Sequence, residues 1–307
     1  MPIQKPKTMN DYNQSIEEAV ALLESTGQFL VVKQMPELDV FSEDDGSEKK
    51  IAVFLDTETT GFDSETDKIL EIGMVKFEYS ADGKIFKILD RMDVYEDPGE
   101  PISDEIIEIT GITNDMVAGE AFDDAAIEDF TKEAVILIAH NAAFDRPFME
   151  KRFPFLEHKA WACSQRDINW RQEHIESSKQ EYIAYKLGFF YTGHRADSDA
   201  EAGVHILSHA SKVDQQPFLY KMLEQARVPN YRIWATDAPF DAKDILKSRG
   251  YRWNPGDDGR PKAWYVDFAT EAEMHDECDF LSESIYPGES KAEVIPVTAK
   301  LRYSTRY

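Results

Sequence analysis

The sequence contains little cysteine and no long apolar run, and each absence excludes a class of protein. Only two of its 307 residues are cysteines, Cys163 and Cys278, and they are not at the spacing of metal ligands. A secreted fold held by disulfides and a structural zinc site are therefore not expected. The longest apolar runs have five or six residues, whereas a membrane-spanning helix needs about 20. Because the polar N-terminus also lacks an apolar signal segment, we expect a cytoplasmic chain with no membrane segment.

Basic residues are scarce relative to acidic ones. The chain has 34 Lys and Arg against 59 Asp and Glu, which gives a net charge of −25. Residues 231–307 account for only −3 of this charge, so nearly all of the excess lies before them. Most of it is expected to be solvated surface. Since surfaces that bind nucleic acid are normally basic, such binding would have to depend on metal ions and a local basic patch.

The apolar pattern predicts an α/β chain with an extension at each end. The hydrophobic content of 42% suffices for a core, and the length predicts about two domains. Residues 1–47 are expected to form an N-terminal helix–strand extension and linker, with a helix at 11–26 and a strand at 28–32 that pack against the main domain. Residues 48–212 alternate between strand and helix patterns, which predicts a mixed central sheet flanked by helices.

The pattern within each part predicts individual elements. In the main domain we expect strands at 51–55, 69–79, 84–94, 134–139 and 159–163, and helices at 103–109, 122–132, 143–153, 179–187 and 197–211. The turn signal Asp82-Gly83 makes the first three strands a meander. Residues 213–230 predict a connecting helix and linker, and residues 231–307 a small α+β domain with a helix at 240–249 and a strand at 262–268.

Two acidic residues directly follow the first strand of the main domain. Asp56 and Glu58 are two positions apart, and residues at that spacing share one face of a strand. Two carboxylates at the end of a buried strand repel each other, so a cation is expected between them. Magnesium or manganese, which prefer oxygen ligands, are the natural candidates.

Two further segments contribute acids at expected helix starts. Asp145 lies in the first turn after His140-Asn141, and Asp199 lies five residues after His194. Strand ends and adjoining helix starts gather at one edge of a layered α/β fold, so Asp56, Glu58, Asp145 and Asp199 can converge on two divalent cations. Such a pair promotes in-line displacement at phosphorus, and His194 is suited to take a proton from the attacking water. The residues thus predict metal-dependent phosphodiester hydrolysis.

The chain resembles the DnaQ-like DEDDh 3′–5′ exonucleases, such as the proofreading subunits and the exonuclease X-like enzymes. The resemblance covers about residues 51–211 and rests on three ordered motifs: Asp-Thr-Glu-Thr-Thr-Gly, His-Asn-Ala-Ala-Phe-Asp and His-x4-Asp. It implies a ribonuclease H-like fold, with the four acids as ligands of two Mg²⁺ or Mn²⁺ ions and His194 as general base. It also implies an active 3′–5′ exonuclease that releases nucleoside monophosphates from single-stranded DNA.

The same resemblance implies which residues hold the 3′-terminal nucleotide. Phe62 stands where the family commonly has leucine, and could stack on a base. The residues implied in substrate binding are Thr57, Thr59, Thr60, Gly61, Phe62, Asn141 and Phe144. His140 is expected to be structural.

Residues 231–307 resemble the accessory domain that follows some exonuclease X-like enzymes. Basic and aromatic residues are interleaved there, as in single-strand binding surfaces, and the candidate patch comprises Lys243, Lys247, Arg252, Trp253 and Lys262. An alternative interpretation is that the aromatic residues form the domain core and the lysines a solvated helix face.

Two alternatives for the whole chain stay open. The acidic surface would suit an RNA or short-oligonucleotide exonuclease, because a short substrate needs less basic surface. It would also suit an acidic, polymerase-associated interaction protein built on an exonuclease scaffold, although the complete set of site residues favours the enzyme. A polymerase or repair partner is conceivable on either interpretation, and the sequence does not determine the oligomeric state.

Overall fold

The main domain is built on a five-stranded mixed sheet. The computed structural model describes residues 9–307, with side chains from Ser15 onward, so the polar residues 1–8 lie outside it. The strands lie in the order β4-β3-β2-β5-β6; they are β2 (Lys50–Thr59), β3 (Ile69–Tyr79), β4 (Ile85–Tyr95), β5 (Ile136–Ala139) and β6 (Trp161–Cys163). The first three form an antiparallel meander, and β5 and β6 run parallel to β2. This arrangement confirms the predicted α/β, ribonuclease H-like fold.

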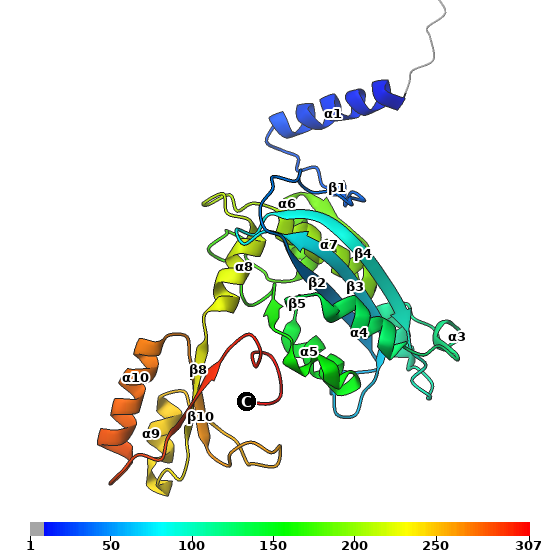
Figure 1. Cartoon of the computed structure of the whole chain (residues 1–307). Helices are drawn as coiled ribbons and strands as arrows, with labels where there is room; N and C mark the ends of the chain where they lie inside the picture. The colour runs from blue at the N-terminus through cyan, green and yellow to red at the C-terminus, as the bar shows by residue number, and fades with distance from the viewer. Residues whose placement is uncertain (1–8) are drawn as a thin grey trace, which may run out of the picture.

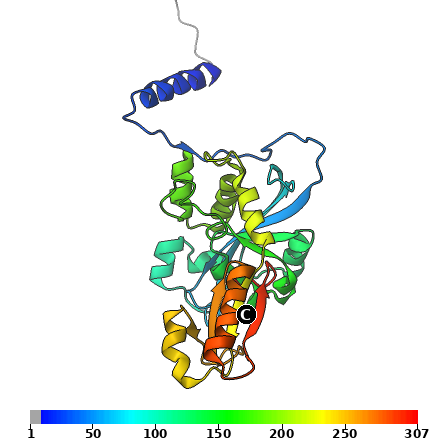
Figure 2. The ribbon, with the colours of Figure 1, turned by 90° about the vertical axis from the view of Figure 1, so that its left-hand side faces the viewer.

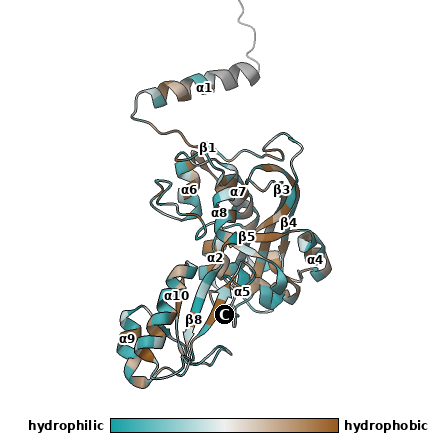
Figure 3. Ribbon diagram, turned by 60° about the vertical axis from the view of Figure 1, so that its left-hand side comes forward, coloured by the Kyte–Doolittle hydropathy of each residue, from teal (hydrophilic) through white to brown (hydrophobic). Residues whose placement is uncertain are grey.

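Alternate residues of β2 face two different layers of helices (Figure 1). Ala52 and Phe54 pack with α6 (Gln180–Leu187), α7 (Ala196–Ser208) and α8 (Phe218–Arg227). Val53 and Leu55 pack with α4 (Asp124–Lys132) and α5 (Ala142–Arg152) on the other face. All four side chains are fully buried. A strand buried on both faces explains the continuous apolar run in its sequence, and Figure 3 shows the same hydrophobic character in the centre of the domain.

Two glycines let α7 approach the sheet closely. A Cβ atom on Gly73 of β3 would lie 2.1–2.2 Å from backbone atoms of Ala196 and Asp197, at the start of α7. A Cβ atom on Gly203 would lie 2.1 Å from the Phe54 ring. Only glycine fits at such distances, so these positions set the depth at which the start of α7 meets β2 and β3.

The N-terminal extension differs from the prediction in two respects. Residues 28–32 form no strand; in the described part of the extension, pairing is limited to a two-residue β1 (Lys33–Gln34) beside β7 (Phe189–Phe190) and a single bridge between Val40 and Lys87. The helix α1 (Met9–Ser25) stands away from the domain (Figure 1), with Ile16 60% and Leu22 68% exposed. The expected packing of the extension against the main domain is therefore wrong for α1. An apolar stripe predicts a helix but does not identify the surface that covers it.

Short elements complete the main domain. They are α2 (Asp104–Thr110), α3 (Asn114–Val117), which was not predicted, and a 3₁₀ turn at Pro154–His158. Ser103 accepts a hydrogen bond from the Ile106 amide and so caps α2, and Gly111 ends it in the left-handed conformation. Within residues 9–307, no helix is both long and apolar enough to cross a membrane.

Residues after α8 form a second, antiparallel sheet in the order β11-β8-β10-β9 (Figure 2). Its strands are β8 (Asn230–Ala235), β9 (Arg252–Trp253), β10 (Trp264–Phe268) and β11 (Glu293–Val297). A 3₁₀ turn at Phe240–Ala242 leads into α9 (Lys243–Ser248), and α10 (Glu271–Phe280) continues as a short π-helical turn, Leu281–Ile285. Neither β8 nor α10 was predicted. The exact domain boundaries stay a prediction.

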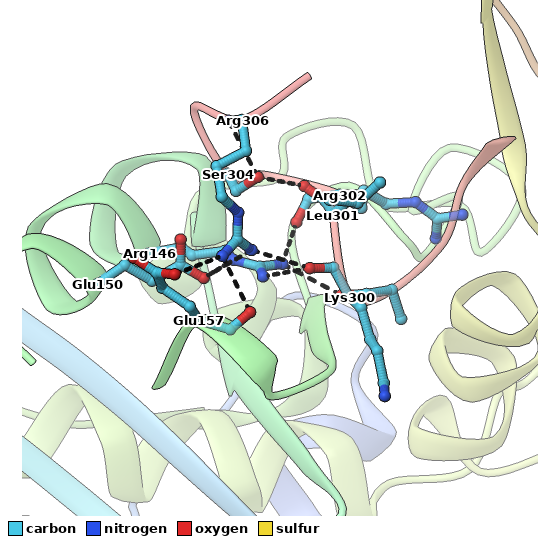
Figure 4. A network of polar contacts seen from close by, with 9 residues as sticks. Arg146, Glu150, Glu157, Lys300, Leu301, Arg302, Ser304 and Arg306 are labelled. Carbon is cyan, nitrogen blue, oxygen red and sulfur yellow. Dashed lines mark hydrogen bonds and ion pairs between the residues drawn. The ribbon is translucent and has the colours of Figure 1, made fainter. Parts of the chain in front are cut away.

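The last ten residues return to the main domain and lie against α5 and β6 (Figure 4). The fully buried Arg146 of α5 donates hydrogen bonds to the carbonyl oxygens of Ala299, Lys300 and Arg302. The Trp161 amide of β6 donates to the Ala299 carbonyl. The C-terminal tail is thus tied to the helix whose first turn carries Asp145.

Candidate active site

Asp56 and Glu58 lie on the face of β2 that is covered by α7. They continue the series of Ala52 and Phe54, which pack against that helix. Asp199 lies in the first turn of α7, and carboxylate oxygens of Asp56, Glu58 and Asp199 all lie within 4.8 Å of one another. The structure therefore brings together three of the four predicted acids, from segments about 140 residues apart in sequence.

Asp145 reaches the same place from the opposite layer. Strand β5 runs parallel to β2 and leads into α5, so the first turn of α5 begins beside the end of β2. Thr57 points to that side and donates a hydrogen bond of 2.9 Å from its hydroxyl to Asp145 Oδ1. The Asp145 side chain is 2% exposed, and its charge contributes to raising the pKa of Asp56.

A set of hydrogen bonds holds Asp199 in place. Its Oδ1 accepts from the Tyr191 hydroxyl at 2.8 Å and from Gln180 Nε2 at 3.4 Å. Its Oδ2 accepts from the backbone amides of His194 at 2.8 Å and Arg195 at 3.3 Å. The four donors fix the carboxylate, and the sequence pattern indicated none of these roles.

The surroundings raise the pKa of all four carboxyl groups of the site. Burial, followed by repulsion from the neighbouring acids, raises the pKa of Asp56 well above its usual value and that of Glu58 to about 8. Burial also raises the pKa of Asp145 to about 7, against the opposing hydrogen bond from Thr57, and raises the pKa of Asp199. Four acids share the site, and no lysine or arginine forms an ion pair with any of them in the described part of the chain.

The chemistry of this donor set fits a divalent cation. The donors are carboxylate oxygen atoms, with no thiol or imidazole among them. Arg195, whose charge acts on Glu58, forms its ion pairs with Glu71 and Asp93 instead. Magnesium and manganese prefer such ligands. Asp56, Glu58 and Asp199 therefore form the candidate centre, with Asp145 beside it.

His194 lies in the loop that leads into α7. Its backbone has a φ of 63°, an uncommon conformation outside glycine, and its amide is held by Asp199. The side chain is 63% exposed, and its Nε2 lies 3.8 Å from a carboxylate oxygen of Glu181 on α6. The imidazole is thus open to solvent and lies beside the Glu181 carboxylate, while the backbone of the same residue contacts Asp199.

The residues predicted to bind the 3′ nucleotide form two groups. Thr57 and Thr59 are buried, and Thr59 donates to the Gly61 carbonyl at 2.5 Å, which shapes the turn. Phe62 is 85% exposed, and its ring lies edge-on to Phe144, with 6.4 Å between centroids. An exposed ring at the rim of the site can stack on a base.

The other predicted positions shape the same rim. The Thr60 hydroxyl accepts from the Lys68 amide at 3.0 Å, and Asn141 Oδ1 accepts from Arg166 at 3.5 Å. His140 is structural as expected: it bonds Ser164 and the Ser178 carbonyl, and burial lowers its pKa to about 4.

One buried ion pair beside the site was not predicted. Glu71 lies opposite Glu58 on β3 and is fully buried. It accepts two hydrogen bonds from Arg195, at 3.1 and 3.0 Å, and one of 2.8 Å from Tyr95. A charged residue within the apolar first half of β3 was the available signal, because such a group needs a buried partner. The pair anchors the loop that carries His194.

The five predicted patch residues of the C-terminal domain do not form a single surface. Lys243, Lys247 and Trp253 line one hollow, and Lys262 is exposed outside it. Arg252 precedes Trp253 on β9, so it points to the opposite face of the sheet, where it pairs with Asp267. The patch as predicted is therefore corrected: alternation along the strand separates Arg252 from Trp253.

Comparisons with known proteins point to a single family. The model of the exonuclease family matches residues 53–207. DNA polymerase III PolC-type of Clostridium perfringens is 34% identical over 172 residues, 52% of this chain and 11% of that protein. The PolC-type polymerase of Thermotoga petrophila is 28% identical over 253 residues, 78% of this chain and 17% of that protein. The chain thus spans less than a fifth of the length of these relatives.

Solved structures of exonucleases are also similar. Exonuclease X in complex with 5′ overhanging duplex DNA is 21% identical, with a TM-score of 0.39, and covers 55% of this chain and 99% of its own. The zinc-bound E. coli exonuclease I–single-stranded DNA complex is 13% identical, with a TM-score of 0.49, and covers 77% of this chain and 71% of its own.

Proposed function

The chain belongs to the exonuclease family, which confirms the predicted enzyme class, a hydrolytic nuclease, and on that premise we propose a specific activity. The enzyme removes nucleoside monophosphates one at a time from the 3′ end of single-stranded DNA. The observation that carries this proposal is the convergence of Asp56, Glu58 and Asp199 within 4.8 Å, beside the buried Asp145. Such a concentration of acids disfavours binding a polyanion unless cations occupy it.

Asp56, Glu58, Asp145 and Asp199 would hold two Mg²⁺ or Mn²⁺ ions. Bound there, the ions would supply charge stabilisation for the attacking and leaving oxygens at phosphorus. The protein supports this by fixing two of the ligands before any ion arrives: Tyr191 and two backbone amides hold Asp199, and Thr57 holds Asp145. Ligands that are already positioned need little reorganisation.

His194 would accept the proton of the attacking water. Its ring is exposed beside the acids, and Glu181, 3.8 Å from Nε2, would stabilise the protonated imidazole. The loop around it is fixed through the Arg195–Glu71 ion pair and the His194 amide. A base within reach of the water but outside the ligand set fits general-base catalysis.

Phe62 and Phe144 would receive the terminal base. Their rings adjoin each other, and Phe62 has almost no contact that would keep it from a ligand. Stacking on aromatic rings tolerates all four bases, as removal of successive nucleotides requires.

The net charge of −25 favours one second candidate, an exonuclease of RNA or short oligonucleotides. A short strand contacts less of the acidic surface. Hydrolysis rates on matched DNA and RNA strands of equal length would decide between the two substrates.

The names of the PolC-type relatives motivate a polymerase as partner of this chain.

The test is hydrolysis of a 5′-labelled single strand in Mg²⁺. A ladder that shortens from the 3′ end is expected, and it should vanish with EDTA or in Asp199→Ala. In His194→Ala the rate should fall about 100- to 10,000-fold, whereas His158→Ala, which removes an exposed histidine elsewhere, should leave it unchanged. Activity that persists in Asp199→Ala would refute the assigned site. Absence of any nuclease activity with Mn²⁺ would instead revive the interaction-protein alternative.

A further inference from the structure

The C-terminal domain has an aromatic hollow that its own core does not use. It has a volume of about 470 Å³ and is lined by Phe240, Trp253 and Trp264, by Lys243 and Lys247 of α9, and by the turn before Phe240. Trp264 and Ala238 also pack against the domain core around Ile233, Leu246 and Met274, whereas Phe240 and Trp253 do not belong to that core. Phe240 is 79% and Trp253 48% exposed, so packing does not account for these two rings.

The rings and lysines of the hollow are arranged together. The Trp253 and Trp264 rings are 5.5 Å apart at an angle of 60°, because paired positions on β9 and β10 point to the same face. Lys243 Nζ lies 4.9 Å from the Phe240 ring centroid, and Lys247 Nζ lies 5.9 Å from that of Trp264. Each cation is therefore placed beside an aromatic surface.

Within the described residues, the two lysines of the hollow keep their charge unpaired. Neither forms an ion pair with a carboxylate in residues 15–307, whereas neighbouring cations do: Arg249 pairs with Glu277 and Arg252 with Asp267. None of the residues that line the hollow is acidic. The hollow is thus a site of free positive charge and open aromatic surface on a protein of net charge −25.

We propose that this hollow binds a segment of single-stranded nucleic acid, with bases stacked on Phe240 and Trp253 and phosphates beside Lys243 and Lys247. This inference rests on the proposed nuclease function for the identity of its ligand. Flat rings combined with unpaired cations match a strand that presents a base and a phosphate in every nucleotide. Helix α9, which carries Lys243 and Lys247 of the hollow, lies at the end of the domain remote from α8 (Figures 1 and 2). It therefore contacts a part of the strand away from the 3′ end under cleavage.

This placement predicts a dependence on strand length. A dinucleotide fills only the active site, whereas an oligonucleotide long enough to occupy both sites gains the stacking energy of the hollow. Loss of the hollow should weaken binding of the long strand and leave hydrolysis of the dinucleotide unchanged.

The experiment measures binding of the full-length protein to oligo(dT) strands in EDTA, which prevents hydrolysis. For strands well beyond about 16 nucleotides, Trp253→Ala should raise Kd about 5- to 100-fold, and Trp253→Phe should restore most of the affinity. A strand of equal length without bases should bind weakly and be insensitive to Trp253→Ala. Replacing both lysines by glutamine should lower the slope of log Kd against log salt by about 1.4.

Ile245→Ala is the matched control, because Ile245 is 46% exposed on α9 and does not line the hollow. The proposal is overturned if folded Trp253→Ala and Phe240→Ala bind the long strand as the wild type does, or if the strand without bases binds equally well. A change of oligomeric mass in these variants without a change in strand affinity also overturns it, in favour of a second copy as occupant. Failure of the nuclease assay with strand binding retained would refute the proposed function alone.

Discussion

Substituting Glu58 by glutamine should stabilise the metal-free protein while abolishing its activity. Burial and the neighbouring acids raise the pKa of Glu58 from 4.5 to about 8. The folded protein therefore binds more protons than the unfolded chain between these pH values, so stability is lost as the pH rises through that window. The full difference between the two pKa values of Glu58 corresponds to a loss of about 5 kcal/mol in the free energy of unfolding at pH 8. Asp56, Asp145 and Asp199 share the repulsion and the bound proton with Glu58. We therefore expect Glu58→Gln alone to raise the free energy of unfolding of the metal-free protein by about 1–2 kcal/mol.

The assay is thermal unfolding in EDTA at pH 5.5 and pH 8. In the wild type the melting temperature should fall between the two values, and in Glu58→Gln at pH 8 it should lie about 2–6 °C higher than in the wild type. Added Mg²⁺ should stabilise the wild type more than the variant. Glu128→Gln, at an exposed position of α4, should leave the melting temperature unchanged. If Glu58→Gln is less stable than the wild type at pH 8 in EDTA, the acids do not repel one another as the geometry implies.

Three further substitutions test how the site is held. Gly73→Ala places a methyl group 2.1–2.2 Å from the backbone at the start of α7. It should lower the free energy of unfolding by about 1–3 kcal/mol and remove most of the activity. Gly288→Ala, where no atom lies within 4 Å, should change neither stability nor activity. Thr57→Val removes the buried hydroxyl that donates to Asp145. Chemical denaturation should show a free energy of unfolding that is lower by about 1–3 kcal/mol. Activation of the enzyme by Mg²⁺ should also be weaker. Arg146→Met removes one donor from each of three tail carbonyls, so hydrogen exchange in residues 298–307 should accelerate; unchanged exchange would show that the other tail contacts, such as the Trp161 amide on Ala299, suffice to hold it.

The sequence predicted the central sheet well because β2, β3 and β5 are largely buried on both faces. Strand β3 matches the predicted residues 69–79, and the two-residue spacing of Asp56 and Glu58 correctly placed both on one face of β2. The signal for these features is local: an apolar run limited by polar turns, and a fixed period of two.

The features that sequence reasoning missed depend on contacts between distant residues. The α10 segment carries five acidic residues in ten and shows no apolar stripe, so only packing in the C-terminal domain reveals it as a helix. Glu71 and Arg195 are 124 residues apart, and neither alone indicates the other. Residues 28–32 look like a strand, yet the fold offers them no partner strand, and a strand exists only through its neighbour.

The acidic excess and the proposed substrate are reconciled if cation binding and strand binding are coupled. Without cations, the raised pKa values of Glu58 and Asp145, about 8 and 7, leave the site partly protonated near neutral pH. A phosphate strand then meets neither a strong repulsion nor an attraction there. Two divalent cations that displace these protons would balance the charge of the four carboxylates and take phosphate oxygens as further ligands, and by reciprocity the strand would raise the affinity for the cations. On this argument the active site gives a strand no attraction without metal, and Lys243 and Lys247 of the C-terminal hollow supply free positive charge that can hold a strand when metal is absent.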